Sequence, residues 1–274
     1  MADPQGLSFP LFAPANRPDR VAKARASRAT CIIADLEDAV APDLKEAARS
    51  ALAEQLNDHS GLPLYVRINA FDTPWFEDDL AMVLGCGATG IVLPKAEDAK
   101  RATALKQRLA PNTQLIGLIE TVSGIAQARA LAHVFDRLHF GSLDYAVSVD
   151  CAHTEKALAH ARAELILAAR LAGKPGPVDG VTPDAKNSAL VCEQARYSSE
   201  MGFKGKLLIH PAQIEPVKQG FRPSSDEISW ANGIIAAGAS NSSGVAMYQG
   251  AMVDAPVIAR AHRLLERVAQ TQAA

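Results

Sequence analysis

The chain has 274 residues, of which 48% are hydrophobic, and its formal net charge is −2 at pH 7. The hydrophobic content supports one substantial core, and the length fits one large α/β domain with a small appendage. The basic residues are dispersed and no apolar run approaches the roughly 18 to 20 residues of a membrane span, so we expect neither a nucleic-acid surface nor a membrane segment.

Short apolar strands alternate with polar helices along the first 221 residues. The predicted strands are 7–13, 31–36, 64–68, 90–93, 115–119, 138–140, 177–181 and 206–209. The predicted helices start near 16–18 and then cover 43–56, 76–84, 97–109, 123–134, 154–171 and 188–201. Short apolar runs are typical of buried parallel strands. Eight such βα units favour a (β/α)8 TIM barrel over a doubly wound sheet, so we predict an α/β barrel over residues 1–221.

The chain changes character after Phe221. Residues 222–226 (RPSSD) indicate a loop and a helix cap, a helix follows to about residue 239, and 240–244 (SNSSG) are predicted to form a flexible tip. The last helix has one apolar face, made of Val257, Ala261, Leu264, Leu265 and Val268. Because the barrel is already complete, we expect 222–274 to form a C-terminal helical extension that packs on the barrel or on a neighbouring subunit.

The cysteines and the N-terminal residues indicate the compartment. The four cysteines are scattered and form no C-x-x-C pair: Cys31, Cys86, Cys151 and Cys192. This pattern is typical of buried thiols in a reducing compartment and not of a disulfide framework or a zinc site. The first 15 residues lack a basic segment and are interrupted by prolines, which argues against a signal peptide. We therefore expect a cytoplasmic protein.

Charged and polar side chains follow the predicted strands. They are Asp35, Glu37, Asp38, Arg67, Asn69, Lys95, Glu120, Asp144, Asp179 and His210. In a TIM barrel the carboxyl ends of the strands share one mouth, where catalytic groups lie. Acids at buried strand ends need a cation or a donor to compensate their desolvation. Carboxylates without a His or Cys cluster suit Mg²⁺ better than zinc, and Glu120 and Asp144 could converge at this mouth.

Eight runs of the sequence resemble, in order, the citrate lyase β-subunit-like proteins of the HpcH/HpaI aldolase group. They are LFAPANRPDRVAKA, IIADLEDAVAPDLKEAAR, YVRINAFDT, IVLPKAED, LIETVSGI, FGSLDYAVSVD, FKGKLLIHPAQIEPV and AMVDAP. The resemblance covers nearly the whole chain. It implies a barrel that assembles as a homotrimer or hexamer, binds Mg²⁺ and acts on CoA or carrier-protein thioesters of hydroxy acids.

The resemblance also implies roles for five residues. Glu120 and Asp144 resemble the metal ligands, and Glu120 also belongs to the substrate-binding set. Arg67 resembles the residue that binds the substrate carboxylate and the enolate, and Glu37 resembles the acid close to the metal. Asp254 resembles an acid contributed by the C-terminal segment of the adjacent subunit, where it would transfer the proton at the acetyl carbon.

The expected reaction is carbon–carbon cleavage of a 3-hydroxyacyl thioester of the malyl-, citramalyl- or citryl-CoA type to an acetyl thioester and a 2-keto acid. Such an enzyme is a lyase of the oxo-acid-lyase type. Two other outcomes of the same site stay open: thioester hydrolysis, as in a (3S)-malyl-CoA thioesterase, and condensation of the malate-synthase kind. A third alternative is the β subunit of a multi-subunit citrate lyase that works with an acyl-carrier protein.

The same residues also have structural interpretations. Glu120 and Asp144 could cap the helices after their strands. Arg67 could be the buried ion-pair partner of Glu37. Lys95 could form a Schiff base, but the acids around it favour a charged lysine in a salt bridge. The residues expected to fix turns and loops are Asp35, Asp38 and His210.

Overall fold

The computed structural model of the chain describes residues 7–57, 61–239 and 246–272. The chain divides into two compact units, one that ends at Lys218 and one that begins at Gln219. The boundary predicted after residue 221 lies three residues further along the chain. The surface on which the C-terminal segment packs stays a prediction.

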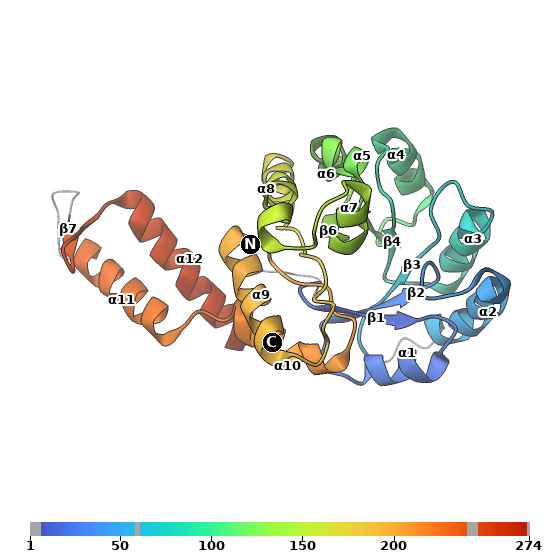
Figure 1. Cartoon of the computed structure of the whole chain (residues 1–274), viewed down its shortest axis with the longest axis horizontal. Helices are drawn as coiled ribbons and strands as arrows, with labels where there is room; N and C mark the ends of the chain where they lie inside the picture. The colour runs from blue at the N-terminus through green and yellow to red at the C-terminus, as the bar shows by residue number, and fades with distance from the viewer. Residues whose placement is uncertain (1–6, 58–60, 240–245, 273–274) are drawn as a thin grey trace. The chain divides into compact units, whose positions relative to one another are not determined.

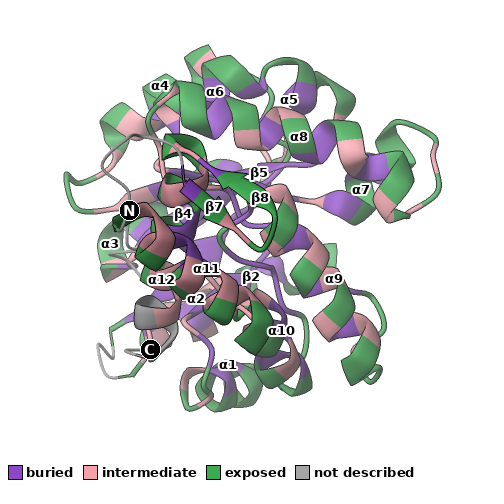
Figure 2. Ribbon diagram, turned by 90° about the vertical axis from the view of Figure 1, so that its left-hand side faces the viewer, coloured by how far each residue is buried: buried purple, intermediate pink, exposed green. Residues whose placement is uncertain are grey.

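Six parallel strands form a sheet in which sequence neighbours are also spatial neighbours. The strands are β1 (Pro10–Pro14), β2 (Cys31–Asp35), β3 (Leu64–Arg67), β4 (Gly90–Leu93), β5 (Gln114–Ile119) and β6 (Arg137–Phe140). Almost every residue of these strands is buried (Figure 2), as expected of strands that are covered on both faces. Asp35 is paired in register with Arg67, so charged side chains meet where β2 and β3 end.

Two further segments close the ring between β6 and β1. The parallel bridges that join them are His139–Val178, Asp179–Lys206 and Leu11–Leu208. The strands predicted at 177–181 and 206–209 are therefore present as single bridges. Pro177 has no N–H to donate and Gly180 offers no side chain to pack, which weakens regular pairing there. The predicted α/β barrel fold is confirmed.

Helices lie around the strands of this first unit (Figure 1). They are α1 (Pro18–Arg25), α2 (Lys45–Leu56), α3 (Phe76–Cys86), α4 (Ala99–Arg108), α5 (Val122–Ala126), α6 (Ala128–Val134), α7 (Ser142–Ser148), α8 (Glu155–Leu171) and α9 (Ser188–Met201), and the boundary between the units falls within α10 (Ile214–Phe221). Short 3-10 helices cover Pro42–Leu44 and Pro211–Gln213. The helix predicted at 123–134 is two helices that meet at Gln127, and α7 was not predicted.

The core of the first unit includes a cluster of apolar side chains contributed by most of the strands. Its members are Leu7, Cys31, Ile33, Tyr65, Val92, Ile116, Leu118, Val178 and Leu207. Fully burying one large aliphatic side chain stabilises a fold by about 1.5–3 kcal/mol, so this cluster gives a rigid base to the residues at the strand ends. Tyr65 is accommodated because its hydroxyl donates to Gln114 Oε1 at 2.8 Å.

The second unit is a helical pair with a short hairpin. Its elements are α11 (Ser225–Ala239), β7 (Ala246–Tyr248), β8 (Ala251–Val253) and α12 (Ala255–Gln272). The predicted apolar face of the last helix is packed, with Ala261 and Leu264 buried against α11 residues such as Ile234. The antiparallel hairpin was not predicted. The predicted flexible tip at 240–244 lies outside the described residues.

Two further expectations concern membranes and cysteines. In the part of the chain that the structure describes, no helix combines the length and the apolar content needed to cross a membrane. The four cysteines are all free, with Cys31 buried and the others partly buried. The prediction of buried thiols therefore holds for Cys31 and not for Cys86, Cys151 and Cys192.

Candidate active site at the carboxyl ends of the strands

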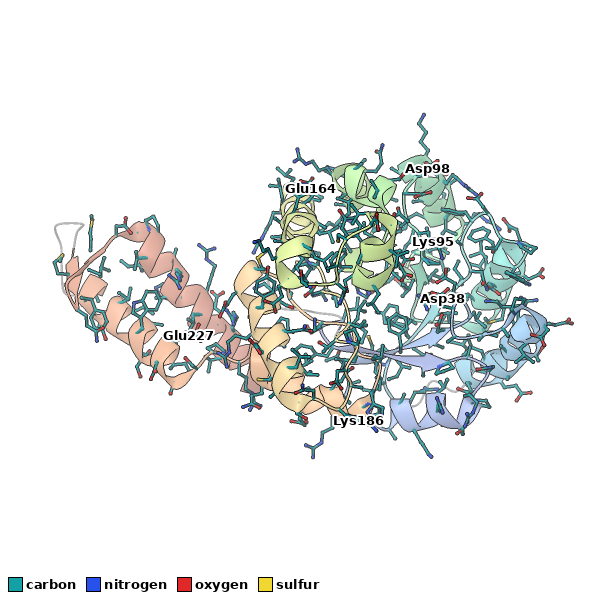
Figure 3. All side chains as sticks on the ribbon, in the orientation of Figure 1. Asp38, Lys95, Asp98, Glu164, Lys186 and Glu227 are labelled. Carbon is teal, nitrogen blue, oxygen red and sulfur yellow. The ribbon has the colours of Figure 1, made fainter. Side chains whose placement is uncertain are left out.

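Five charged residues come together where β2 to β5 end. We call Asp35, Glu37, Arg67, Lys95 and Glu120 the strand-end cluster. Asp35 and Arg67 are the last residues of β2 and β3, and Glu120 directly follows β5. Lys95 lies two residues beyond the end of β4 (Figure 3). All of them except Lys95 are buried, so their charges must compensate one another.

Arg67 is surrounded by acids. Its Nε and Nη2 donate to the two carboxylate oxygens of Asp35 at 2.7 and 2.5 Å. Its Nη1 lies 3.1 Å from Glu37 Oε2, as an ion pair that lacks the alignment of a hydrogen bond. Burial disfavours the charged guanidinium, but the carboxylates of Asp35 and Glu37 outweigh it and raise the pKa of Arg67. The ion pair with Glu37 is therefore present, and Asp35 provides the stronger contact.

The turn after β2 holds Glu37 in place. Asp35 accepts the backbone N–H of Glu37 at 2.9 Å, in addition to its contacts with Arg67. The ammonium of Lys45, on α2, donates to the carbonyl of Glu37 at 2.7 Å and to Asn69 Oδ1 at 2.8 Å. Burial raises the pKa of the Glu37 carboxyl, although Arg67 and Lys95 partly oppose this. Asp35 has the predicted turn-fixing role and is also the main partner of Arg67.

Lys95 connects two of the acids. Its ammonium donates to Glu37 Oε1, and its backbone N–H donates to Glu120 Oε1 at 2.8 Å. Its φ of 48° lies in the left-handed region, which costs a residue with a side chain roughly 1–2 kcal/mol. Burial lowers the pKa of Lys95, but the hydrogen bond and charge of Glu37 outweigh it and raise the pKa overall. The expected salt bridge is confirmed, and the lysine stays protonated at neutral pH.

Glu120 has one carboxylate oxygen without a partner. Its side chain is 2% exposed, and Oε2 has no hydrogen-bond partner among the described residues. Burial, with the nearby charge of Glu37, raises the pKa of Glu120 to about 8. The helix after β5 is capped by Thr121, whose hydroxyl accepts from Gly124 at 2.9 Å. Helix capping therefore does not explain why Glu120 is buried here.

Asp144 lies in the first turn of α7 and is exposed. Its negative charge also contributes to the raised pKa of Glu120, so the two carboxylates are close enough to repel each other. Gly141, which precedes α7, packs directly on Glu120. A Cβ at this position would lie 2.4 Å from Glu120 Oε2, so the close approach requires glycine.

The donor set fits a hard divalent cation. A buried oxygen without a partner and a neighbouring exposed carboxylate are ligands that Mg²⁺ prefers, and Mg²⁺ usually keeps free positions for water and substrate oxygens. Among the described residues, no three His, Cys, Asp or Glu side chains are grouped as a complete metal cage. Glu120 and Asp144 could therefore hold Mg²⁺ only together with oxygens from water or substrate.

Three other predicted residues lie outside the strand-end cluster. Asp179 is fully buried and binds Arg162 on α8 at 3.0 Å and Ser198 on α9 at 2.5 Å, which is a structural role. His210 accepts the N–H of Ala212 at 3.1 Å and fixes its loop as expected. Asp254 accepts the N–H of Val257 at 3.2 Å at the start of α12, in the second unit. Its catalytic role stays a prediction.

An open cleft of about 640 Å³ borders the cluster. Its lining comes from the loop after β3, the residues that follow β4 and the start of α4, and the region of α5: 70–73, Lys95, Glu97, Asp98, Arg101, Ser123, Ala126 and Gln127. Lys95 belongs to this lining, whereas the other four members of the cluster do not. A ligand in the cleft would therefore meet Lys95 before the buried acids.

Sequence reasoning did not identify the buried contacts of Lys45, the packing of Gly141 on Glu120 or the backbone role of Lys95. Lys45 is the first residue of α2, and nothing in the local sequence indicates that it is buried beneath the turn after β2. Gly141 lies shortly before the strand-end acid Asp144, and a glycine at such a position indicates close packing. The contact of Lys95 N–H with Glu120 depends on a backbone conformation that the sequence does not reveal.

Comparison with known proteins identifies the family. The HpcH/HpaI aldolase/citrate lyase family profile matches residues 8–211. A citrate lyase subunit beta-like protein of Deinococcus radiodurans is 35% identical over 98% of this chain and 99% of that protein. A (3S)-malyl-CoA thioesterase of Cereibacter sphaeroides is 35% identical over 94% of this chain and 93% of that protein.

A solved structure extends the similarity to the whole fold. The CitE protein of Mycobacterium tuberculosis, in complex with magnesium, acetoacetate and coenzyme A, superimposes with a TM-score of 0.85. It is 34% identical and covers 96% of this chain and 98% of that one. The chain therefore belongs to the HpcH/HpaI aldolase/citrate lyase family, which confirms the resemblance and the assignment to a class of lyases.

Proposed function

We propose that this member of the family is a Mg²⁺-dependent carbon–carbon lyase. It cleaves a 3-hydroxyacyl thioester of the malyl-, citramalyl- or citryl-CoA type to an acetyl thioester and a 2-keto acid. The observation that carries this proposal is the buried oxygen of Glu120, which has no hydrogen-bond partner in the described part of the chain, near the charge of Asp144. The magnesium and coenzyme A of the related CitE structure support it.

Glu120 and Asp144 are the residues that would hold the ion. A bound Mg²⁺ supplies a Lewis acid, which lowers the pKa of a substrate hydroxyl and polarises a carbonyl. In the reaction the hydroxyl loses its proton, the bond between the hydroxyl carbon and the α-carbon of the thioester breaks, and the α-carbon takes up a proton. The hydroxyl carbon becomes the keto carbon of the 2-keto acid.

The residues of the chain contribute binding and proton transfer. Arg67 provides a rigid planar donor for a carboxylate or for the enolate oxygen that develops on the thioester. Glu37 lies between Arg67 and Lys95 and orients a water near the reacting oxygens. Asp254 delivers the proton to the acetyl carbon, and we propose that it does so from a neighbouring subunit of a homotrimer or hexamer.

Product analysis with malyl-CoA tests the proposal. Glyoxylate and acetyl-CoA in equal amounts, formed with Mg²⁺ and lost with EDTA, support the lyase. Malate and free CoA would instead support a thioesterase, the alternative favoured by the 35% identity to a (3S)-malyl-CoA thioesterase. Formation of malyl-CoA from glyoxylate and acetyl-CoA measures the reverse reaction, and subsequent release of malate would indicate a condensing enzyme of the malate-synthase kind.

The same assay decides whether other subunits are needed. Several relatives are named as citrate lyase β subunits, which favours an acyl-carrier partner as an alternative to free CoA. Activity of the purified chain on a CoA thioester would exclude a strict requirement for such a partner. A panel of malyl-, citramalyl- and citryl-CoA then identifies the acyl group.

A further inference from the structure

Lys95 is the member of the strand-end cluster that faces open space. Its side chain is 48% exposed, whereas that of Arg67 is 10% exposed. It lines the cleft of about 640 Å³ and contacts Glu37 at the same time. Its ammonium is therefore placed between the buried acids and the route by which a ligand would enter.

The donors of the two cations differ in how accessible they are to a ligand. Arg67 directs Nε, Nη1 and Nη2 at acids, and its face is stacked 5.0 Å from the centre of the Phe12 ring. The ammonium of Lys95 has three N–H groups. Within the described part of the chain, Glu37 Oε1 is the one acceptor assigned to it. Lys95 therefore keeps two donors for a ligand on a side chain that lines the cleft, whereas the remaining donors of Arg67 belong to a side chain that is only 10% exposed.

We propose that Lys95 binds an anionic oxygen of the substrate acid through its exposed ammonium, while its backbone N–H holds Glu120 in position. The ligand class is a 2-oxo acid or the corresponding 3-hydroxyacyl group, whose carboxylate matches a half-exposed cation. This inference rests on the proposed function and adds a substrate-binding residue to it. It also explains why a left-handed backbone conformation is maintained at a residue that is not glycine.

The geometry separates this role from two others. A Schiff-base lysine must be unprotonated to attack a carbonyl, but the contact with Glu37 favours the ammonium form. A purely structural lysine would stabilise Glu37 and Glu120 without touching a ligand. If Lys95 is purely structural, removing its side chain should weaken metal binding and ligand binding equally. If Lys95 binds the ligand, the same change should weaken ligand binding and leave metal binding nearly unchanged.

Calorimetric titration of pyruvate in the presence of Mg²⁺ tests the proposal, with Mg²⁺ titrated separately in the absence of pyruvate. Pyruvate stands for the 2-keto acid product of the proposed reaction. Lys95→Met removes the charge, Lys95→Arg keeps it, and Lys95→Gly removes it while suiting the positive φ. Lys100→Met is the matched control, because Lys100 is an exposed lysine on α4 outside the cleft.

We expect Lys95→Met and Lys95→Gly to weaken pyruvate binding about 10- to 100-fold, the usual range for a hydrogen bond to a charged group. Mg²⁺ affinity should change less than about threefold, since the backbone N–H to Glu120 remains. Lys95→Arg should retain pyruvate affinity within about fivefold, and Lys100→Met should match the wild type.

Two results would overturn the role of Lys95 alone. One is wild-type pyruvate affinity in both neutral variants. The other is a parallel loss of Mg²⁺ and pyruvate binding that Lys95→Arg does not restore, which would show a structural role. If the wild-type chain binds neither Mg²⁺ nor pyruvate, the proposed lyase function fails and the role of Lys95 fails with it.

Discussion

Neutralising Glu120 should change the pH dependence of stability in the metal-free protein. The structure raises the pKa of Glu120 from 4.5 to about 8, mainly because the carboxyl is buried. A raised pKa means that the folded state favours the protonated acid. The stabilisation is fully present below pH 4.5 and is lost as the pH rises through about 8. Glu120→Gln replaces the protonated acid by a neutral group of the same shape.

The size of this loss of stability follows from the pKa of Glu120 in the unfolded and folded states. The difference between about 8 and 4.5 is about 3.5 pH units, and each unit corresponds to about 1.36 kcal/mol. The full effect is therefore about 5 kcal/mol, of which about 4 kcal/mol is lost between pH 5 and pH 9. Over this range the free energy of unfolding of the wild type should fall by that amount relative to Glu120→Gln.

Urea unfolding in EDTA at a series of pH values measures this difference. Glu54→Gln is the control, because Glu54 is exposed on α2 and its replacement should change stability little at any pH. In a second series at pH 9 without EDTA, Mg²⁺ at 100 times its Kd should stabilise the wild type by about 2.7 kcal/mol and leave Glu120→Gln unchanged. A difference between wild type and Glu120→Gln that stays constant from pH 5 to pH 9 would refute the reasoning.

Three other perturbations test the site. Gly141→Ala should lower Mg²⁺ affinity by about tenfold or more in a calorimetric titration, since its Cβ would lie 2.4 Å from Glu120 Oε2. Gly85→Ala should not, because a Cβ there would meet nothing within 4 Å beyond the neighbouring backbone of its own helix. Asp254→Asn should reduce kcat about 10²–10⁴-fold with Mg²⁺ affinity unchanged, and a normal kcat would exclude proton transfer by this residue. Borohydride with pyruvate should leave Lys95 unmodified by mass spectrometry, because its ammonium is held by Glu37; a trapped adduct would contradict this.

The sequence alone was sufficient for features that depend on local patterns. The strand at 90–93 and the helix at 188–201 were predicted with the bounds that the structure shows. Apolar runs of four to six residues specify buried strands because such strands are covered on both faces. The acids and cations at the strand ends were also identified, since the βα repeat determines that these ends share one mouth.

Features that depend on distant or irregular contacts were not predictable. The hairpin of β7 and β8 forms in a segment without a strong strand pattern. The seventh and eighth strands of the barrel are present only as single bridges, which form when the ring closes. The preference of Arg67 for Asp35 over Glu37 arises from the register of β2 with β3. Contacts of this kind depend on tertiary pairing, which local propensity does not encode.

The sequence by itself determined which residues reach the mouth of the barrel: Glu120, Asp144, Arg67 and Lys95 all follow or end apolar strands. The tertiary structure decided what each of them does there. It gives Glu120 Oε2 no hydrogen-bond partner within the described residues, places Gly141 against the same carboxylate, and turns the backbone N–H of Lys95 toward Glu120. The physical reason is that a side chain's position along a strand is local, whereas its burial, charge neighbours and backbone strain are set by residues far away in the chain.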